Sequence, residues 1–496
     1  MAWTRGARWL RVVFRCSARL HLLGPSGLAT AGAPVIVNGR PVLIYASLKY
    51  VIADLDGHRM AWNSNGANGF RPCLRHCNVL KKNSGTVDVD PAFVEITCSD
   101  TVRFGANTCA DVYRNADALI EARARVAAGA MTQTRFKNLE KVFGLKCAPR
   151  GVLVDRDLRG ILDVVDSSVI DWVHTALQDG TFTIEVRLLV QRVGATLGIT
   201  FDDVASFLQD GWFFPAWGRA KSNQLFRVFD PRRSPDEDKV KASASELLGL
   251  YSLLRHFVEL YLLDVPETAK EATSFRAACA TIDVITLVKQ GRLSLAEGAV
   301  LLRRTHSQHM RLHIDAYGEG HIVPKHHFMY DVADQWERRS VVIDAFVVER
   351  LHLRVKHIMD PIRNTRQFEE SCLSSLINAH ILSLQKHKFC DTLVGHTSRL
   401  PGSAVPMSDQ MVVKGMTTTV GDIVILDGVA GKVCACARDG DEFFALVNIF
   451  VHISVVTAHS DRWRAGDRIE AWPADALLSA SAWYTADNDT VVLRIT

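Results

Sequence analysis

The sequence predicts an α/β protein with a large helical region and a small C-terminal antiparallel β barrel or sandwich. An apolar run near position 50 ends in the acidic turn ADLDG, as a buried strand does. Apolar residues recur at helical spacing between about 110 and 395, and over 406–496 they alternate in twos between DG turns. The chain of 496 residues, 48% of them hydrophobic, is long enough for about two to four compact units.

Residues 1–34 form a basic tail without an acidic side chain, and the first acidic residue of the chain is Asp54. Arginine recurs along an apolar background, at Arg5, Arg8, Arg11, Arg15 and Arg19. This composition is typical of a mitochondrial transit peptide. The alternative is translated upstream sequence or a truncated gene product, in which case the tail carries no targeting information.

The segment 35–148 begins with the strand that leads to Asp54 and Asp56 and ends in a helical stretch. Paired carboxylates can hold Mg²⁺ or Mn²⁺ for phosphoryl transfer, because these hard cations prefer oxygen ligands. An ordinary D-x-D-G turn after a strand is the alternative. Asp54 is therefore a candidate both for catalysis and for metal binding.

A loop rich in Gly and Asn precedes Cys73 and Cys77, which predicts a zinc-knuckle-like insert. Two thiolates one turn apart can share a tetrahedral Zn²⁺ ion. Further ligands would complete the set, the candidates being His58, His76, Cys98 and Cys109. Two unrelated buried thiols are the alternative. The 11 cysteines are odd in number and irregularly spaced, which argues against a disulfide framework.

The region 149–398 is predicted to be mainly helical. In SSVIDWVHTALQDG, Asp171 and His174 stand at i and i+3, on one face of a helix. A carboxylate and an imidazole placed in this way can bind a metal or orient a reacting water. The alternative is an aspartate that starts the helix and a histidine that packs in the core.

Eight of the 18 histidines fall between positions 306 and 357, among them the adjacent pair His326 and His327 in PKHHF. Adjacent side chains point to different faces of any regular element, so one metal ion is not expected to bind both rings. Farther along, Glu349 stands among basic residues. These are Arg350, Arg354, Lys356, Arg363 and Arg366. Such a helix suits a catalytic glutamate beside a phosphate backbone, or is simply a solvated amphipathic helix.

The order of these motifs resembles that of CACTA-like cut-and-paste transposases, most of all the transposon-encoded proteins abundant in some protist genomes. That family has a strand-end aspartate followed by K-G-x-x-G-x-x-P-C-x-x-C, then S-x-x-x-D-W-M-H, K-P-K-H-H-F, H-E-R-K-H and R-N-T-x-x-F-E. The matching stretches here are IADLDGHRMAWNSNGANGFRPCLRHC, SSVIDWVH, VPKHHF, VERLH and RNTRQFEE. The resemblance covers residues 45–395, and the order of the motifs is more specific than any single one.

The resemblance implies a partial RNase H-like core that cleaves and joins DNA through two divalent metals held by three carboxylates. It implies Asp54 as the second catalytic Asp, Glu349 as the closing Glu, and Asp171 with His174 as the D-x-x-H signature. Residues 1–53 contain no acid that could serve as the first Asp. The Cys pair also has three intervening residues where the family has two.

A DNA-binding protein without strand-transfer activity is therefore expected, located in the nucleus, or in mitochondria if the tail is a targeting signal. An active nuclease completed by an upstream extension, and a protein-interaction module without DNA binding, are the alternatives. Homo-oligomers and a protein partner for 406–496 are compatible with the sequence. No membrane partner is expected, because the most apolar stretch, 246–263, carries Arg255, His256 and Glu259.

Overall fold

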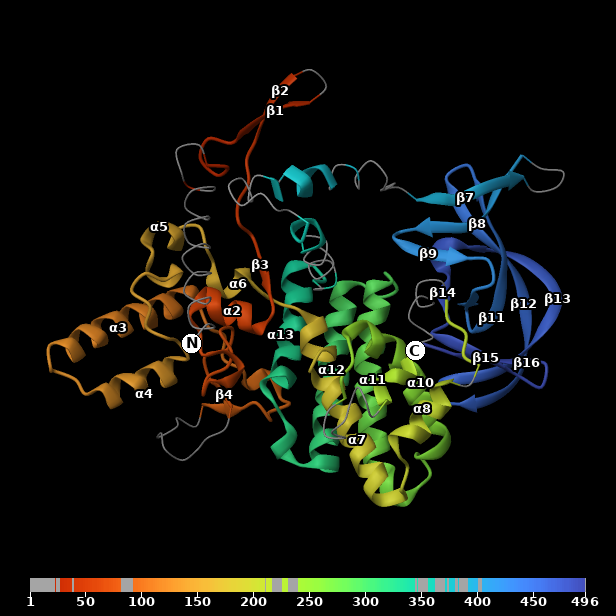
Figure 1. The fold of residues 1–496 in the computed structure, drawn as a ribbon, viewed down its shortest axis with the longest axis horizontal. Coiled ribbons are helices and arrows are strands. Elements are labelled where there is room, and N and C mark those ends of the chain that lie inside the picture. Colours follow the sequence, from red (N-terminus) through yellow and green to blue (C-terminus); the bar gives the residue numbers. More distant parts are fainter. Residues whose placement is uncertain are drawn as a thin grey trace. The chain divides into compact units, whose positions relative to one another are not determined.

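The computed structural model of the chain divides into two units (Figure 1). Unit 1 comprises 1–181, 295–314 and 318–345, and unit 2 comprises 182–294, 315–317 and 346–496. The structure describes residues 23, 27–37, 40–81, 92–209, 211–215, 225–230, 240–343, 346, 356–361, 371–372, 374–379, 382, 391–399 and 404–495. The chain is mixed α/β, as predicted.

Unit 1 contains three short strand pairs within its described residues. Strands β1 (Ala33–Val37) and β2 (Arg40–Ile44) form an antiparallel hairpin. Strands β4 (Val79–Leu80) and β5 (Val94–Glu95) are parallel. Strand β3 (Val51–Ala53) pairs in parallel with β6, which covers Ser168–Ile170. Parallel pairing of β3 and β6 joins segments more than 100 residues apart and brings their carboxyl ends to the same edge.

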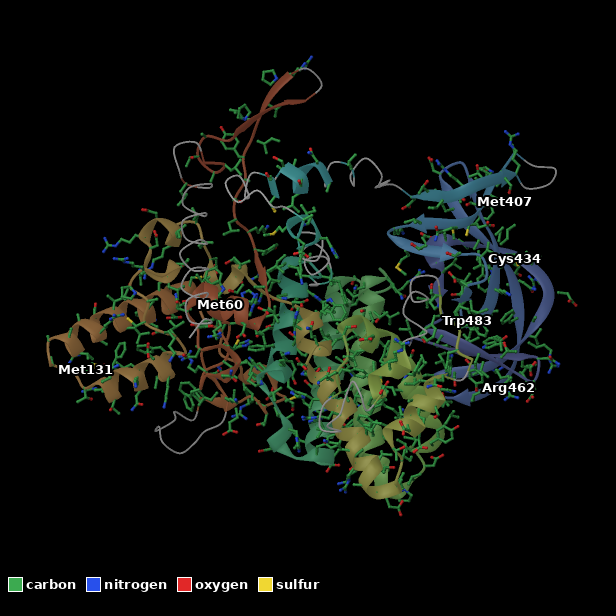
Figure 2. The ribbon with its side chains drawn as sticks, in the orientation of Figure 1. Met60, Met131, Met407, Cys434, Arg462 and Trp483 are labelled. Atoms are coloured by element: carbon green, nitrogen blue, oxygen red, sulfur yellow. The ribbon has the colours of Figure 1, made fainter. Side chains whose placement is uncertain are left out.

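Unit 1 also contains several helices and helical turns. They are α2 (Leu55–Trp62), α3 (Cys109–Ala127), α4 (Gln133–Phe143), α5 (Arg156–Arg159), α6 (Val164–Ser167), the π-helical turn Val173–Leu177, α12 (Leu295–Tyr317, whose last turn belongs to unit 2) and α13 (Pro324–Arg339). Short 3₁₀ turns lie at Gly66–Asn68, Thr101–Arg103, Val152–Val154 and Glu319–His321. Helices α3 and α4 form a hairpin with Met131 in its turn (Figure 2). The hairpin packs on a core that includes Trp62, Leu119 and Leu158.

Helix α13 is buried on almost all sides, unlike a surface helix with a single apolar stripe. Pro324 occupies its first turn, where the missing amide hydrogen costs nothing. Its buried residues include polar ones, namely His326, His327, Asp331 and Gln335. Burying a polar group costs free energy unless the group has a hydrogen-bond partner, so the buried polar residues of α13 are expected to contact other polar groups of unit 1.

Unit 2 begins with helices: α7 (Thr181–Leu197), α8 (Phe201–Gln209), α10 (Ala244–Tyr261) and α11 (Ala269–Lys289), with 3₁₀ turns at Leu225–Phe229 and Pro266–Thr268. A capping box of Ser243 and Glu246 starts α10. This is the apolar stretch with internal charges, and its Arg255 forms a buried ion pair with Asp283 of α11. Among the described residues, no helix has both the length and the apolar character needed to cross a membrane.

The C-terminal part of unit 2 is an antiparallel sheet. Ten strands belong to it in the described part of the chain: β7 (Thr392–Arg399), β8 (Pro406–Val413), β9 (Met416–Thr419), β10 (Ile423–Leu426), β11 (Val429–Asp439), β12 (Glu442–Thr457), β13 (Ser460–Pro473), β14 (Leu478–Ser479), β15 (Ala482–Ala486) and β16 (Asp489–Leu493). The main path runs β14-β10-β11-β12-β13-β16-β15, and β8 joins β7, β9 and β11. The sheet is antiparallel as predicted. Among the described strands, β14 and β15 at the two ends of this path do not pair with each other. The sheet is therefore not closed, and the predicted β barrel was wrong.

Tight turns connect several of these strands. Asp427 and Gly428 between β10 and β11 both have positive φ, as do Lys414 and Gly415 between β8 and β9. Two such residues form the type I′ turn that matches the twist of a two-residue hairpin, which explains the DG signal in the sequence. The long strands β12 and β13 bend at register shifts and extend along the whole sheet (Figure 1). The side chain of Trp483 lies on this sheet, and its backbone pairs with that of Phe213 (Figure 2).

Candidate functional site

Two predicted carboxylates lie at the same edge of the β3–β6 pair. Ala53 and Ile170 are register partners, and Asp54 and Asp171 are the residues that follow them. The carboxyl ends of neighbouring parallel strands are a common place for polar and catalytic side chains. The structure thus brings together two residues that the sequence could only place 117 positions apart.

Asp171 is 2% exposed and is held by several donors. The backbone amides of Val173 and His174 each donate to its carboxylate at 3.1 Å, and Nδ1 of His174 lies 2.5 Å from Oδ2. Asp171 and His174, which the sequence places on one helix face, are therefore in contact at the start of the π-helical turn, where Asp171 also accepts from the first backbone amides. These contacts orient the carboxylate, so it has little freedom to turn away from the edge.

Asp54 is exposed and caps α2, accepting a hydrogen bond from the amide of Gly57 at 2.6 Å. A Cβ atom at Gly57 would lie 2.7 Å from Cβ of Ala53, so the close approach requires glycine. Asp56, the other member of the D-x-D pair, points elsewhere and forms an exposed ion pair with Arg59 at 2.9 Å. The predicted pair of Asp54 and Asp56 therefore does not share one site, and the aspartate at the same strand edge as Asp54 is Asp171.

Lys325, in the first turn of α13, supplies a positive charge near this edge. Its Nζ donates to the carbonyl oxygen of Gln178 at 2.8 Å. Burial lowers the pKa of Lys325, and the carboxylates of Asp179, Asp54 and Asp171 oppose that lowering. The lysine of the PKHH motif is thus a site residue that the sequence analysis did not single out.

A second polar cluster of unit 1 consists of Cys73, His76, His327 and Asp331, all buried. The first two belong to the loop before β4, and the last two stand one turn apart on α13. One donor atom of each lies within 4.8 Å of the others, a group that could hold a metal ion. The sequence predicts His76 as one candidate for the further zinc ligands, whereas it does not predict His327 or Asp331 as ligands.

The contacts inside the cluster are short. Sγ of Cys73 donates to Oδ2 of Asp331 at 3.3 Å and lies 3.7 Å from Nδ1 of His76. The same Nδ1 lies 3.0 Å from Nε2 of His327 and 3.3 Å from Oδ1 of Asp331. The four donors therefore converge on one small volume.

Burial shapes the protonation of this cluster. It raises the pKa of the Cys73 thiol well above the usual value, and the charge of Asp331 adds to that effect. Burial also raises the pKa of Asp331 and lowers that of His327 well below the usual value. Without a bound cation, these groups favour their neutral forms.

Cys77, predicted as the second thiolate, does not belong to the cluster. Its amide donates to the carbonyl oxygen of Gly105 at 2.9 Å, and its Sγ lies beside the Gly105 backbone. Because the loop here is not helical, a four-residue step does not bring the two thiols to one side. Cys98, Cys109 and His58 also have other partners, namely Asp100, Asp163 and Val169.

The adjacent histidines of PKHHF separate as expected. The ring of His326 faces His306, His309 and His313 of α12, with ring centroids 5.2 to 6.5 Å apart. Burial and the neighbouring histidines lower the pKa of His306 to about 3. His327, by contrast, points to the Cys73 cluster. One position along the helix thus separates two different polar environments.

The predicted DNA-binding helix lies largely outside the described residues. This applies to Glu349, Arg350, Arg354, Arg363 and Arg366. Lys356 is described, and it is exposed in a short helical segment. The tail 1–22 is likewise outside the described residues.

Comparison of the chain with protein-family models, with curated proteins and with solved structures finds no match in any of the three.

Proposed function

We propose that this chain is a transposase-derived DNA-binding protein in which Asp54 and Asp171 hold a divalent cation, Mg²⁺ or Mn²⁺, against a DNA phosphate. The observation that supports this most is the parallel β3–β6 register, which places the two aspartates at one edge. In this proposal β3 and β6 are neighbouring strands of an RNase H-like core. Asp54 is then the first carboxylate of the site and Asp171 the second.

This assignment replaces the one implied by the motif order alone, in which Asp54 was the second Asp and the first was missing. The earlier strand carries Asp54, and the strand beside it carries Asp171. The lack of acidic residues before Asp54 is then no obstacle to a cation site. Glu349, the third carboxylate that the motif order implies, lies outside the described residues.

The residues at the edge fit a hard cation. Both donors are carboxylates, one accessible and one held in place by His174 and two amides. Such a cation supplies positive charge to a phosphate group and can polarise it. Lys325 adds a positive charge at the same edge, and its partly buried ammonium can contact a phosphate oxygen.

The proposal is tested by measuring duplex DNA binding by fluorescence anisotropy, with Mn²⁺ or with chelator present. Binding is expected to be stronger with Mn²⁺ and to weaken steeply with salt. Asp54→Asn and Asp171→Asn should remove the Mn²⁺ effect. Asp56→Asn is the matched control, because Asp56 is exposed, two residues away and paired with Arg59.

Equal DNA affinity with and without Mn²⁺ would overturn the cation-bridged contact. A complete lack of DNA binding, together with a defined protein partner, would favour the interaction module instead. Charge reversal at Arg354, Lys356 and Arg363 should weaken binding uniformly across DNA sequences.

DNA strand cleavage is the second candidate function, favoured by the same pair of carboxylates at one edge. A Mn²⁺-dependent nicking assay on supercoiled DNA addresses it. Nicking that is lost in Asp54→Asn, Asp171→Asn and Glu349→Gln but kept in Asp56→Asn would establish an active nuclease. Cation-dependent binding without nicking would leave the DNA-binding function alone.

A further inference from the structure

The Cys73, His76, His327 and Asp331 cluster has the donors of a transition-metal site. It combines one thiol, two imidazoles and one carboxyl group, and all four side chains are buried. Thiolate, imidazole and carboxylate are the three ligand types that Zn²⁺ takes in proteins. His327 and Asp331 stand at i and i+4 on α13, so they project side by side from one face of the helix.

The spacing of the donors fits a single tetrahedral ion. Bonds of about 2.0 to 2.3 Å at tetrahedral angles put ligand atoms roughly 3.3 to 3.6 Å apart. Four of the observed separations run from 3.0 Å, between the two imidazoles, to 3.7 Å, between Sγ of Cys73 and Nδ1 of His76. One donor atom from each of the four residues lies within 4.8 Å of the other three, so the donors can close around such an ion by small movements.

Hydrogen bonds alone do not satisfy this cluster. Nδ1 of His76 faces Sγ of Cys73, Nε2 of His327 and Oδ1 of Asp331, yet it carries at most one hydrogen. Oδ1 of Asp331 is fully buried and has no hydrogen-bond partner. An unsatisfied carboxylate oxygen in the interior is costly, and a bound cation removes that cost.

We propose that Cys73, His76, His327 and Asp331 bind one Zn²⁺ ion in a closed, structural site. With four ligands from the protein, no coordination position is left for water or substrate, as is usual for structural zinc. The ion joins the loop before β4 to α13, two segments about 250 residues apart in the chain. Nε2 of His76 faces the carboxylate of Asp334, which Arg303 holds, but at 3.9 Å it does not form a hydrogen bond to it.

The same two segments hold strand β6. Arg75, between two of the ligands, donates to the carbonyl oxygen of Ser168 at 3.0 Å. Gln335, one turn after Asp331, accepts from the amide of Ile170 and donates to its carbonyl oxygen. The zinc ion therefore positions the strand that ends at Asp171. This consequence rests on the proposed function, whereas the binding of the ion does not.

The test uses the purified full-length chain, freed of metal and titrated with Co²⁺ as a spectroscopic substitute for Zn²⁺. We expect visible bands of tetrahedral cobalt and a thiolate-to-cobalt charge-transfer band, both abolished by added Zn²⁺. Cys73→Ser should remove the charge-transfer band. His327→Gln and Asp331→Asn should weaken cobalt affinity by more than about 100-fold, beyond what loss of an outer partner costs.

Matched controls come from neighbouring residues. Cys77→Ser and His326→Gln alter a nearby thiol and an equally buried histidine, and both should keep the charge-transfer band. Asp331→Cys guards against misfolded variants, because it adds a second thiolate and should strengthen the band roughly twofold, in proportion to the number of Co–S bonds.

The proposal is overturned if the wild-type chain shows no thiolate-to-cobalt band, or if that band survives Cys73→Ser. Neither result depends on DNA binding. If the cobalt bands appear as expected while Mn²⁺ has no effect on DNA affinity, the zinc site stands and the proposed function fails.

Discussion

The two units each bury a cluster of polar side chains, and the clusters balance their charges differently. In unit 2, Arg255 and Asp283 form an ion pair with both side chains 1% exposed, and the hydroxyl of Tyr251 donates to Asp283 at 3.0 Å. Arg255 also donates to the carbonyl oxygen of Arg494 at 2.7 Å. A permanent cation thus meets the buried carboxylate inside the unit, and Nε of Arg255 is the one nitrogen of that guanidinium group without a hydrogen-bond partner.

In unit 1, the buried Asp331 bonds to a thiol and approaches an imidazole. Neither Cys73 nor His76 carries a permanent positive charge as an arginine does, because a thiol is never a cation and an imidazole can lose its proton. The buried carboxylate of unit 2 is thus paired with a cation from the protein, whereas that of unit 1 belongs to a group that could hold a metal ion. Matching substitutions and stability measurements in the two clusters can therefore test this difference.

The largest expected effect is in unit 2. Asp283→Ala leaves Arg255 buried without its counter-charge, which should lower the free energy of unfolding by about 3 to 5 kcal/mol. Urea denaturation followed by circular dichroism measures the loss. Replacing both partners, with Arg255→Met and Asp283→Leu, should restore much of the stability. If Asp283→Ala lowers the free energy of unfolding by no more than the double substitution does, an unpaired Arg255 is not the cause of the loss.

Metal removal is expected to affect unit 1 alone. A ligand present at 100 times its dissociation constant stabilises the folded state by about 2.7 kcal/mol, so a chelator should lower the stability of unit 1 by an amount of that order. Hydrogen exchange of α13, compared with that of α10 and α11, measures the effect in each unit. Cys73→Ser should make α13 insensitive to the chelator. An equal loss of protection from hydrogen exchange in α13 and in α10 and α11 would show that chelation does not act on unit 1 alone.

Acid should destabilise unit 1 through His306. Its folded pKa of about 3 lies below the ordinary 6.5, so the unfolded chain binds more protons between these pH values. The contribution of neutral His306 to the free energy of unfolding is complete above pH 6.5. It is lost as the pH falls, by up to about 1.4 kcal/mol per pH unit. His306→Gln should reduce this slope in denaturation experiments between pH 6.5 and 4. An unchanged slope would show that His306 does not remain neutral in the folded chain.

A smaller acid effect is expected in unit 2. Burial lowers the pKa of His256 to about 4, against the opposing charge of Glu259. The shift is smaller than that of His306, so the loss of stability on acidification should be smaller too. His256→Gln, measured over the same pH range, gives the comparison. A slope change larger than that of His306→Gln would reverse the predicted order.

Local signals predicted much of the secondary structure. The DG turn at Asp427 and Gly428 and the alternation around it identified the C-terminal strands, because a type I′ turn depends only on neighbouring residues. The order of the strands in the sheet was out of reach, because pairs such as β8 with β11 join strands that are not consecutive. The barrel alternative failed for this reason.

The sites show the same limit. The i, i+3 spacing of Asp171 and His174 was readable from the sequence, and the two residues are in contact. The β3–β6 register and the convergence of Cys73 with α13 depend on long-range folding, which spacing does not reveal. One signal was available and missed: His327 and Asp331 form an H-x-x-x-D pair at helical spacing, a better ligand pattern than Cys73 with Cys77.

An anomalous difference map at the zinc absorption edge would test most directly whether the buried cluster of unit 1 binds the proposed zinc ion. Crystals of the purified chain would be grown without added metal. We expect a peak within about 2.0 to 2.3 Å of Sγ of Cys73, Nδ1 of His76, Nε2 of His327 and a carboxylate oxygen of Asp331. Ordered side chains at these four positions with no peak between them would contradict the proposed zinc site.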